Sequence, residues 1–590
     1  MKKIILKPTR LAAFLVVVVM GVFLYWEFVP TTVDTIVVNA RIYTMDDGNS
    51  VVEAMAIRGD RIIGIGSTSR MRRKYSASSV IDAGGKTILP GLIDAHAHFI
   101  SLGIARLTVD LVGAQSESDA GSRVKLRVAK SSPGQWIRGR GWDQNDWPVK
   151  TFPSHENLDR VAPANPVILS RIDGHAIWVN RKAMEIAGIT RTTLDPEGGK
   201  IVRDAGGNPT GVFVDNAKGL IGRFVAEPSV GELEEAISKA QEECLSVGLT
   251  GVHDMGVSNE EVEIYKRLID AGKLKIRLYG AIGGMGETWE QFKKMGPLLG
   301  YGNNHLTVRA LKLYVDGALG SRGAALVEEY SDDPGNRGLT VTSESELQKS
   351  VDEAIGTGFQ VCTHAIGDRG NNIALNVYEN GLKKHPVNDP RLRIEHVQVL
   401  MLSDIPRFAQ LGIIPSMQPT HCTSDMYWAE ARLGSQRLPG AYAWRSLLNT
   451  GAKILGGSDF PVEHPNPLFG IYAAVTRRDK NGKPMGAKDM NLFQLSDRAS
   501  HDSSHYVNGW YASQSMTRLE AVRAFTSWAA WGAFEESIKG SLEEGKLADF
   551  IILSDDIFVV PESQIHTIEV EQTFLGGSKV FQRRANASNL

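Results

Sequence analysis

Cysteine is scarce in this chain of 590 residues. Cys244, Cys362 and Cys422 lie far apart and without C-x-x-C spacing, which excludes a disulfide framework and a thiolate zinc cluster. An excess of charge of one sign is also missing, since 65 Lys and Arg residues oppose 67 Asp and Glu residues. A chain this balanced has no global electrostatic attraction to nucleic acid, so no nucleic-acid partner is expected.

Long hydrophobic runs are missing from most of the chain, and the composition of 42% hydrophobic and 22% charged residues excludes a disordered, collagen-like or multi-span membrane protein. The exception is near the N-terminus, where a basic segment, residues 1–10, precedes an uncharged apolar run, residues 11–26. A bilayer span needs ~20 apolar residues, whereas the apolar region of a cleaved signal has roughly 7–15. The run has an intermediate length, and no A-x-A-like cleavage site follows it.

We therefore expect residues 1–32 to form an N-terminal basic segment and an uncleaved membrane anchor. Because the positive flank stays in the cytoplasm, the catalytic part is expected in the periplasm or outside the cell. Secretion after signal cleavage is the first alternative, and a buried element of the main fold is the second.

The two ends of the remaining chain have the pattern of a small β domain. Residues 33–90 contain short alternating strands separated by turns such as Gly59-Asp60, and residues 536–590 contain the similar stretches ADFIILSDD and HTIEVEQTFLGGSKVFQ. Neither part has enough strands for a stable core. We expect the two parts to complete one composite β-sandwich domain.

Strand and helix patterns alternate over residues 91–535, which is typical of a parallel sheet. Eight short apolar runs, each followed by a polar loop, predict an α/β fold with a (β/α)₈ TIM-like barrel; they lie at residues 87–98, 249–255, 276–282, 308–317, 359–368, 391–398, 412–418 and 452–460. The gap between the first two runs is too long for a loop. An inserted α/β subdomain is therefore expected at about residues 101–240, between barrel strands 1 and 2.

Ionisable residues recur where the predicted strands end, which is where barrels of this kind carry their active sites. His96 and His98 close the first strand, and residues i and i+2 of a strand point to one side. Further strands carry Lys312, His364, His396 and Asp459. A single histidine there is usually structural, but the set together, with a buried strand lysine that is rare without a role, predicts a site for zinc or a related divalent ion.

Several motifs resemble a known family. PGLIDAHAH, GGSDFPV, and ADFIILSDD after GSLEEGK resemble the amidohydrolase superfamily. GRGWDQNDWP (139–148), KLYVDGALGSRGAAL (312–326) and HAIGDRG (364–370) resemble its family 3, the YtcJ-like amidohydrolases. The resemblance extends from about residue 33 to residue 583, and all six metal-ligand positions of the pattern are filled.

The resemblance implies roles for these residues. His96, His98 and Asp459 would bind the more buried ion, and His364 and His396 a second one. Lys312 would be N6-carboxylated by carbon dioxide and bridge the two ions. The sequence leaves open whether one or two ions bind, because one-metal members of the superfamily exist.

The metal site predicts a hydrolase. A divalent ion lowers the pKa of a bound water from 15.7 toward about 7, so that metal-bound hydroxide forms near neutral pH. Asp459 would accept a proton during attack and give it to the leaving amine. We expect hydrolysis of a C–N bond other than a peptide bond, in an N-acyl or N-formyl amine or a cyclic amide. Ester, lactone or phosphoester hydrolysis, deamination, and a non-catalytic anchored metal-binding scaffold are the alternatives.

Residues on the substrate side are also predicted. By resemblance, His175 in the insertion reaches the metal site and helps to hold the carbonyl oxygen, unless it is a structural histidine. The other candidates each have a structural alternative, such as core packing, a turn cap or a surface role; they are Trp142, Asp143, Asn145, Asp316, Arg322 and His421. The sequence leaves the oligomeric state open, a homodimer included.

Overall fold

The computed structural model describes residues 30–226, 228–483 and 508–584. The membrane anchor predicted over residues 1–32 lies almost entirely outside the described residues, which begin at Pro30. Within the described part of the chain, every helix is too short or too polar to cross a bilayer.

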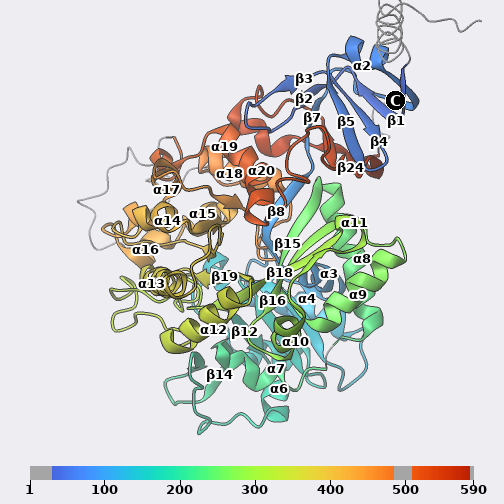
Figure 1. Ribbon diagram of the computed structural model, residues 1–590. Helices are drawn as coiled ribbons and strands as arrows, with labels where there is room; N and C mark the ends of the chain where they lie inside the picture. Colours follow the sequence, from blue (N-terminus) through green and yellow to red (C-terminus); the bar gives the residue numbers. More distant parts are fainter. Residues whose placement is uncertain (1–29, 227, 484–507, 585–590) are drawn as a thin grey trace, which may run out of the picture.

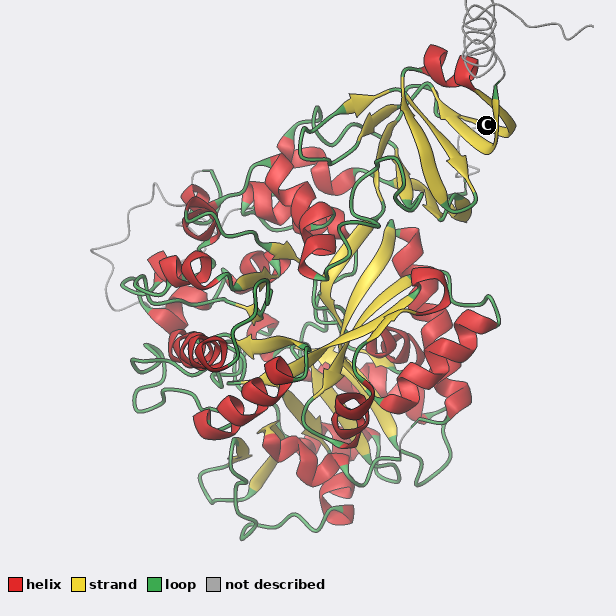
Figure 2. Cartoon of the chain, viewed as in Figure 1, coloured by secondary structure: helices red, strands yellow, loops and turns green. Residues whose placement is uncertain are grey.

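A parallel barrel forms the centre of the molecule (Figures 1 and 2). Its eight strands follow one another in chain order around the sheet; they are β8 (Leu92–Ala97), β15 (Leu249–Val257), β16 (Arg277–Gly283), β18 (Leu306–Tyr314), β19 (Gln360–Ala365), β20 (Arg393–His396), β21 (Ile414–Met417) and β22 (Leu455–Gly456). Each strand lies within or overlaps one of the predicted runs, and the predicted fold class is confirmed. The short β17 (Leu298–Gly300) pairs with β18 outside this order.

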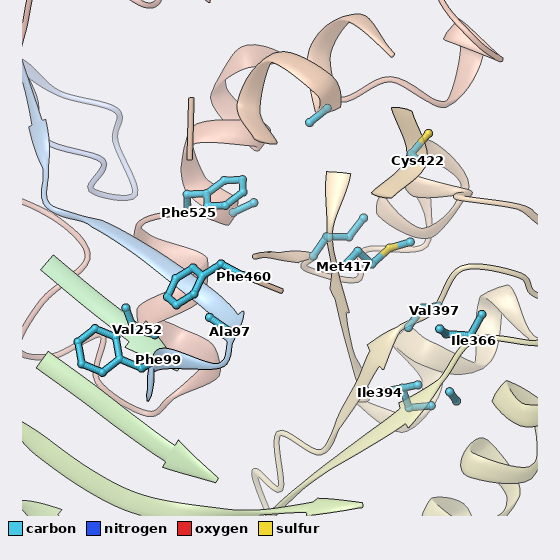
Figure 3. Packing of buried hydrophobic residues seen from close by; sticks show 14 of the residues in the cluster. Ala97, Phe99, Val252, Ile366, Ile394, Val397, Met417, Cys422, Phe460 and Phe525 are labelled. Atoms are coloured by element: carbon cyan, nitrogen blue, oxygen red, sulfur yellow. The ribbon is translucent and has the colours of Figure 1, made fainter. Parts of the chain in front are cut away.

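The barrel closes through the segment that follows β22. The backbone N–H of Asp459 donates to the carbonyl of His96 (2.7 Å), and the N–H of His98 donates to the carbonyl of Phe460 (2.8 Å). Figure 3 shows Phe460 beside Ala97, where both belong to the buried apolar core. The first and last strands are thus joined at their C-terminal ends.

Helices on the outside of the barrel begin at strong local signals. In α8 (Val230–Ser246), α9 (Asn259–Asp270) and α12 (Glu344–Gly356), an N-cap serine and a glutamate three residues later form a capping box. Each of these helices buries one apolar face against the strands. The remaining helices that surround the sheet include α3 (Phe99–Leu107), α10 (Glu287–Met295), α13 (Asp368–Lys384), α14 (Ile405–Leu411), α17 (Trp444–Asn449), α18 (Pro467–Thr476), α19 (Arg518–Ala524) and α20 (Ser527–Gly532).

The chain between β8 and β15 builds a second sheet, as the length of this segment predicts. Its order is β13-β14-β12-β11-β10-β9, with bounds β9 (Val109–Asp110), β10 (Ile137–Trp142), β11 (Val167–Arg171), β12 (Ala176–Val179), β13 (Gly199–Arg203) and β14 (Pro209–Asp215). Helices α4 (Glu117–Val128), α5 (His155–Val161) and α6 (Arg181–Ile186) belong to the same segment. Trp142, Trp147 and Trp178 pack together in its core.

Both ends of the described chain contribute to the β domain at the top of Figure 1. One sheet has the order β5-β4-β1-β6 and the other β25-β24-β23-β7-β2-β3. The N-terminal strands are β1 (Thr31–Val38), β2 (Arg41–Tyr43), β3 (Val51–Val52), β4 (Ala54–Arg58), β5 (Arg61–Gly66), β6 (Tyr75–Asp82) and β7 (Thr87–Pro90). The C-terminal strands are β23 (Phe550–Leu553), β24 (Val570–Leu575) and β25 (Ser578–Gln582).

Strand β7 joins the two ends, because it pairs with β2 on one side and with β23 on the other. Side chains of the two sheets share one apolar core, which includes Val37, Ile57, Phe550 and Phe574. This arrangement is the expected composite sandwich, while the exact limits of the domains stay a prediction.

Candidate metal centre

Three side chains from the first and last barrel strands converge on one point. His98 Nε2 lies 3.2 Å from Asp459 Oδ1, and His96 Nε2 lies 3.5 Å from the same oxygen. The donor atoms of all three residues lie within 4.8 Å of one another. The backbone hydrogen bonds that close the barrel hold this arrangement, because they pair the end of β8 directly with the segment that carries Asp459.

A second group shares Asp459. Donor atoms of His396, His421 and Asp459 also lie within 4.8 Å of one another. The ring of His364 packs on the ring of His396, with centroids 4.5 Å apart. Lys312 reaches in from β18, and its Nζ lies 3.3 Å from His96 Nε2. The structure therefore brings the predicted metal ligands into one cluster at the C-terminal ends of the strands.

Two of these residues have unusual backbone conformations. Asp459 has φ 59° and His396 has φ 78°, in the left-handed region that side chains other than glycine rarely adopt. Such positions cost free energy and persist when the surrounding structure holds them in place. At His396 this conformation turns the backbone and ends β20. The side chains of Glu395 and His396, although adjacent in sequence, can therefore both contact His96.

Burial favours the neutral form of the imidazoles of His96, His364 and His396. Burial and the nearby Lys312 lower the pKa of His96 to about 4, and burial lowers the pKa of His364 and His396 well below the usual value. Burial also lowers the pKa of the Lys312 amine. Neutral imidazole is the form that binds a metal ion, so the histidines are ready to act as ligands at neutral pH.

Other polar groups orient the imidazoles, and the sequence reasoning missed them. The Nδ1–H of His96 donates to Glu395 Oε2 (2.6 Å), and the Nδ1–H of His396 donates to Gln418 Oε1 (2.8 Å). In each ring the Nε2 atom is left for a metal ion, the usual arrangement at metal sites. Glu395 could have been found, because a carboxylate inside a buried strand and directly before a candidate ligand is rare without a role.

Asp94 is a further missed residue. Its carboxylate accepts hydrogen bonds from the backbone N–H of His96 (3.1 Å) and from the Ser458 hydroxyl (2.6 Å), and burial raises its pKa to about 7. The side chain therefore links β8 to the segment before Asp459.

Unpartnered atoms show that the cluster fits a cation. Asp459 Oδ1 and His421 Nε2 are buried, and apart from the 3.2 Å approach of His98 Nε2 to Asp459 Oδ1 they have no hydrogen-bond partner within the described protein. Buried polar atoms without partners are costly, and a metal ion would satisfy both the carboxylate oxygen and the imidazole nitrogen. The donor set of imidazole nitrogens and a carboxylate is the one that zinc and related ions prefer.

A cavity of about 1440 Å³ opens above the cluster. This volume exceeds the roughly 300–1,000 Å³ of an ordinary small-molecule pocket. Of the predicted site residues, those that line it are His98, Asp143, His175, Lys312, Asp316, His364, His396, His421 and Asp459. The insertion supplies one wall of the cavity and the barrel loops supply the other walls.

The remaining candidates for substrate binding are not among the residues that line this cavity. Trp142 is fully buried in the core of the insertion, where its indole N–H donates to the carbonyl of Leu169 (2.8 Å). The Asn145 side chain accepts from Arg432 (3.3 Å), and Arg322 pairs with Asp332 (3.0 Å). These positions agree with the structural alternatives and give no support to substrate contacts.

Asp316 lines the cavity but acts as a structural link. Its carboxylate accepts from the backbone N–H groups of Ala325, Ile366 and Gly367 at 2.8–2.9 Å. The loop after β18 is thereby tied to the loop after β19, which follows His364. Asp143 likewise forms an ion pair with the buried Arg171.

A parallel barrel that gathers imidazoles and a carboxylate at its C-terminal end, under a large cavity, defines a class of protein, the barrel-type metal-dependent hydrolases. Comparison with known proteins gives the family. The sequence model of the Amidohydrolase family (Amidohydro_3) matches residues 79–581, and the chain belongs to this family.

Curated relatives match over nearly their whole length. The putative amidohydrolase YtcJ of Bacillus subtilis is 34% identical over 554 residues, which cover 92% of this chain and 98% of the relative. The protein LONG AFTER FAR-RED 3 of Arabidopsis thaliana is 33% identical, and the match covers 95% of this chain and 94% of the relative. The N-substituted formamide deformylase of Arthrobacter pascens is 27% identical, and the match covers 93% of this chain and 98% of the relative.

A solved structure agrees with this assignment. An uncharacterized metal-dependent hydrolase from Pyrococcus horikoshii OT3 superimposes with a TM-score of 0.70 at 27% identity, covering 90% of this chain and 99% of that one. The chain is thus a hydrolase of the amidohydrolase family, whose superfamily is metal-dependent.

Proposed function

We propose that the protein hydrolyses a C–N bond other than a peptide bond, in an N-acyl or N-formyl amine or a cyclic amide. The observation that carries the proposal is the shared position of Asp459, which lies against His96 and His98 in one group and against His396 and His421 in the other. A relative of this chain is an N-substituted formamide deformylase, which supports a C–N bond as the target.

A bound divalent ion would activate water and polarise the substrate carbonyl. His96, His98 and Asp459 would hold one ion, and His364 and His396 would hold a second. Asp459 is the base of the proposed reaction: its carboxylate would take the proton of the attacking water and pass it to the leaving nitrogen. The cavity wall of the insertion would exclude bulk water from the reacting atoms.

We propose zinc as the metal and a carboxylated Lys312 as the bridging ligand. Burial lowers the pKa of the Lys312 amine, and a neutral amine is the form that reacts with carbon dioxide. Elemental mass spectrometry of the purified protein tests this part. Two ions per chain would support the bridge, and one ion would remove the bridge but leave hydrolysis. No metal after zinc and bicarbonate are supplied would favour the non-catalytic scaffold.

A substrate panel tests the reaction. The panel contains N-formyl amines, N-acyl amines and cyclic amides, with esters, lactones, phosphoesters and aminopurines for the alternative reactions. We expect turnover of an amide-type member by the zinc-loaded protein, and a kcat lower by about 10²-fold or more for the same preparation of D459N. Turnover of the esters, phosphoesters or aminopurines alone would refute the C–N assignment.

We also propose that residues 1–32 anchor the protein in the membrane with the catalytic part outside the cytoplasm. Mass spectrometry of the mature N-terminus tests the anchor. A chain that keeps residue 2 or the initiator Met would support it, whereas a chain that starts near residue 30 would show a cleaved signal.

A further inference from the structure

A histidine and an aspartate of the insertion face each other at the cavity. His175 directly precedes β12, and Asp215 ends β14, the neighbouring antiparallel strand. The backbone N–H of Asp215 donates to the carbonyl of His175 (2.8 Å), and His175 Nδ1 lies 2.7 Å from Asp215 Oδ1. Backbone and side-chain hydrogen bonds therefore hold the same two residues together.

The side chain of Asp215 is buried in a space that the neighbouring backbone leaves open, and its Oδ2 atom has no hydrogen-bond partner within the described residues. Its side chain is 3% exposed, and its backbone has φ 49°, which is uncommon for a residue with a side chain. A Cβ atom at Gly317 or at Gly323 would lie 2.7 Å from Asp215 Oδ2. These glycines belong to the loop after β18. Because they have no side chains, this barrel loop leaves room for the carboxylate of Asp215.

The contact with Asp215 directs the other ring nitrogen of His175. Because Nδ1 carries the hydrogen that the carboxylate accepts, Nε2 is left free to contact a molecule in the cavity. The ring of His175 packs against the ring of His364, with centroids 5.1 Å apart, and His364 packs in turn against His396. His175 thus lies at one end of a row of imidazoles, whereas Asp459 contacts His96 and His98 at the other end.

We propose that Asp215 is a positioning residue for the reaction: it fixes the ring and the tautomer of His175 so that Nε2, which carries no hydrogen in this tautomer, accepts a hydrogen bond from the N–H group of the substrate amide. This inference rests on the proposed function, since it assigns a role within the same site. The partner of His175 comes from the insertion and not from the barrel. The insertion therefore contributes residues to the active site in addition to forming one wall of the cavity.

The chain offers a matched control for the test. His155 Nδ1 lies 2.7 Å from Asp159 Oδ2, the same distance as in the His175–Asp215 pair, and both residues belong to the insertion. Neither residue lines the cavity. D159N therefore removes an equivalent histidine–carboxylate contact without touching the site.

The first experiment follows the tautomer by ¹⁵N NMR of the full-length protein carrying ¹⁵N-labelled histidine, with the His175 signals assigned by their loss in H175Q. We expect a protonated Nδ1 in the wild type. In D215N the new amide can donate to Nδ1, so the proton moves to Nε2 and both ¹⁵N signals shift. D159N leaves the His175 signals unchanged. A wild-type spectrum with the proton on Nε2 would overturn the proposal even if D215N failed to fold.

The second experiment measures turnover of the best amide of the substrate panel by zinc-loaded variants of equal metal content. We expect D215N to lower kcat by roughly 10- to 10³-fold with little change in KM, because a wrongly oriented group fails mainly in the transition state. The kcat of D159N is expected to stay within about twofold of the wild-type value. Adding D215N to H175Q is expected to lower kcat no further than H175Q alone does. If the losses in kcat caused by D215N and by H175Q were fully additive in the double variant, Asp215 would not act through His175.

The two hypotheses fail in distinguishable ways. If the wild type hydrolyses no member of the panel, the proposed function fails, while the ¹⁵N signals still decide how Asp215 orients His175. If the wild type is active and D215N keeps full kcat, the positioning role is refuted and the proposed function stands.

Discussion

Asp459 is the residue on which both groups of metal donors depend. Replacing its carboxylate by the amide in D459N keeps the size and one oxygen but removes the base. We expect the variant to retain much of its metal and to lose kcat by about 10²-fold or more. Metal content and steady-state kinetics with an accepted amide measure the two effects. A kcat near that of the wild type would disprove the proton-transfer role.

Glu395 acts on the metal site through His96, to which it binds with its buried carboxylate. E395Q keeps the shape of the side chain but replaces the charged acceptor by a neutral one, which weakens the hold on the imidazole. We expect zinc affinity to fall by about 10- to 100-fold in a chelator competition. E536Q alters a glutamate that pairs with Arg391 before β20 and serves as the control. If E395Q bound zinc as tightly as the control E536Q, Glu395 would have no part in metal binding.

At the residue level, the sequence indicates which candidate ligands lie close together but not which residues support them. His96 and His98 are separated by one residue at the end of an apolar run, so strand geometry alone places them together. Asp215 lies 40 residues from His175 and meets it only because β12 pairs with β14. Spacing along the chain carries no signal for such a pair. Arg322, a candidate for substrate binding with a surface role as its alternative, forms an ion pair with Asp332.

Among the elements, the helices that begin with capping boxes were the most predictable. In α9 the N-cap Ser258 forms hydrogen bonds with Glu261, and the Glu261 side chain is partly buried near Asp254 of β15. Burial, and then the nearby Asp254, raise the pKa of Glu261 to about 7. The same position in α12 is the exposed Glu346, whose hydrogen bonds to Ser343 lower its pKa.

This difference predicts a pH effect on stability. A carboxyl whose pKa is raised in the folded state stabilises the fold below its unfolded pKa, and that contribution is lost as the pH rises from about 4.5 to about 7. We expect wild-type protein to lose up to about 3 kcal/mol relative to E261Q over this range, at about 1.4 kcal/mol per pKa unit. Gln keeps the capping box.

Urea midpoints of both proteins at pH 4.5 and pH 8 measure the effect. E346Q is the matched control and is expected to show no loss of this sign, because the pKa of Glu346 is lowered. Parallel pH profiles of the wild type and E261Q would contradict the prediction.

Element boundaries were less predictable where strands are short. Strand β22 consists of Leu455–Gly456 alone, so periodicity could not identify it, and the run at 452–460 was recognised through the residues that follow it. The insertion was predicted from its length, but its strand order was not. That order depends on packing around Trp142 and Trp178, which the pattern of one strand does not reveal.

On the scale of the whole molecule, a metal ion would join the first strand of the barrel to the last. Because binding to the folded state alone stabilises it, zinc at a hundredfold excess over its Kd is expected to add about 2.7 kcal/mol. We expect the apparent Tm of chelator-treated protein to rise on addition of zinc, and the rise to be smaller in H98A. Calorimetry checks this. An unchanged Tm in the wild type would show that zinc does not bind the folded chain.

The sharing of one sheet by β7 and β23 also determines the order of events during synthesis. A nascent chain emerges at about 5–20 residues per second, so the strands before the barrel wait for tens of seconds before β23 leaves the ribosome. During that time β7 has an unpaired edge, and such edges attract other chains. Because the barrel can assemble in the interval, we expect the composite sandwich to be the last part of the fold to close.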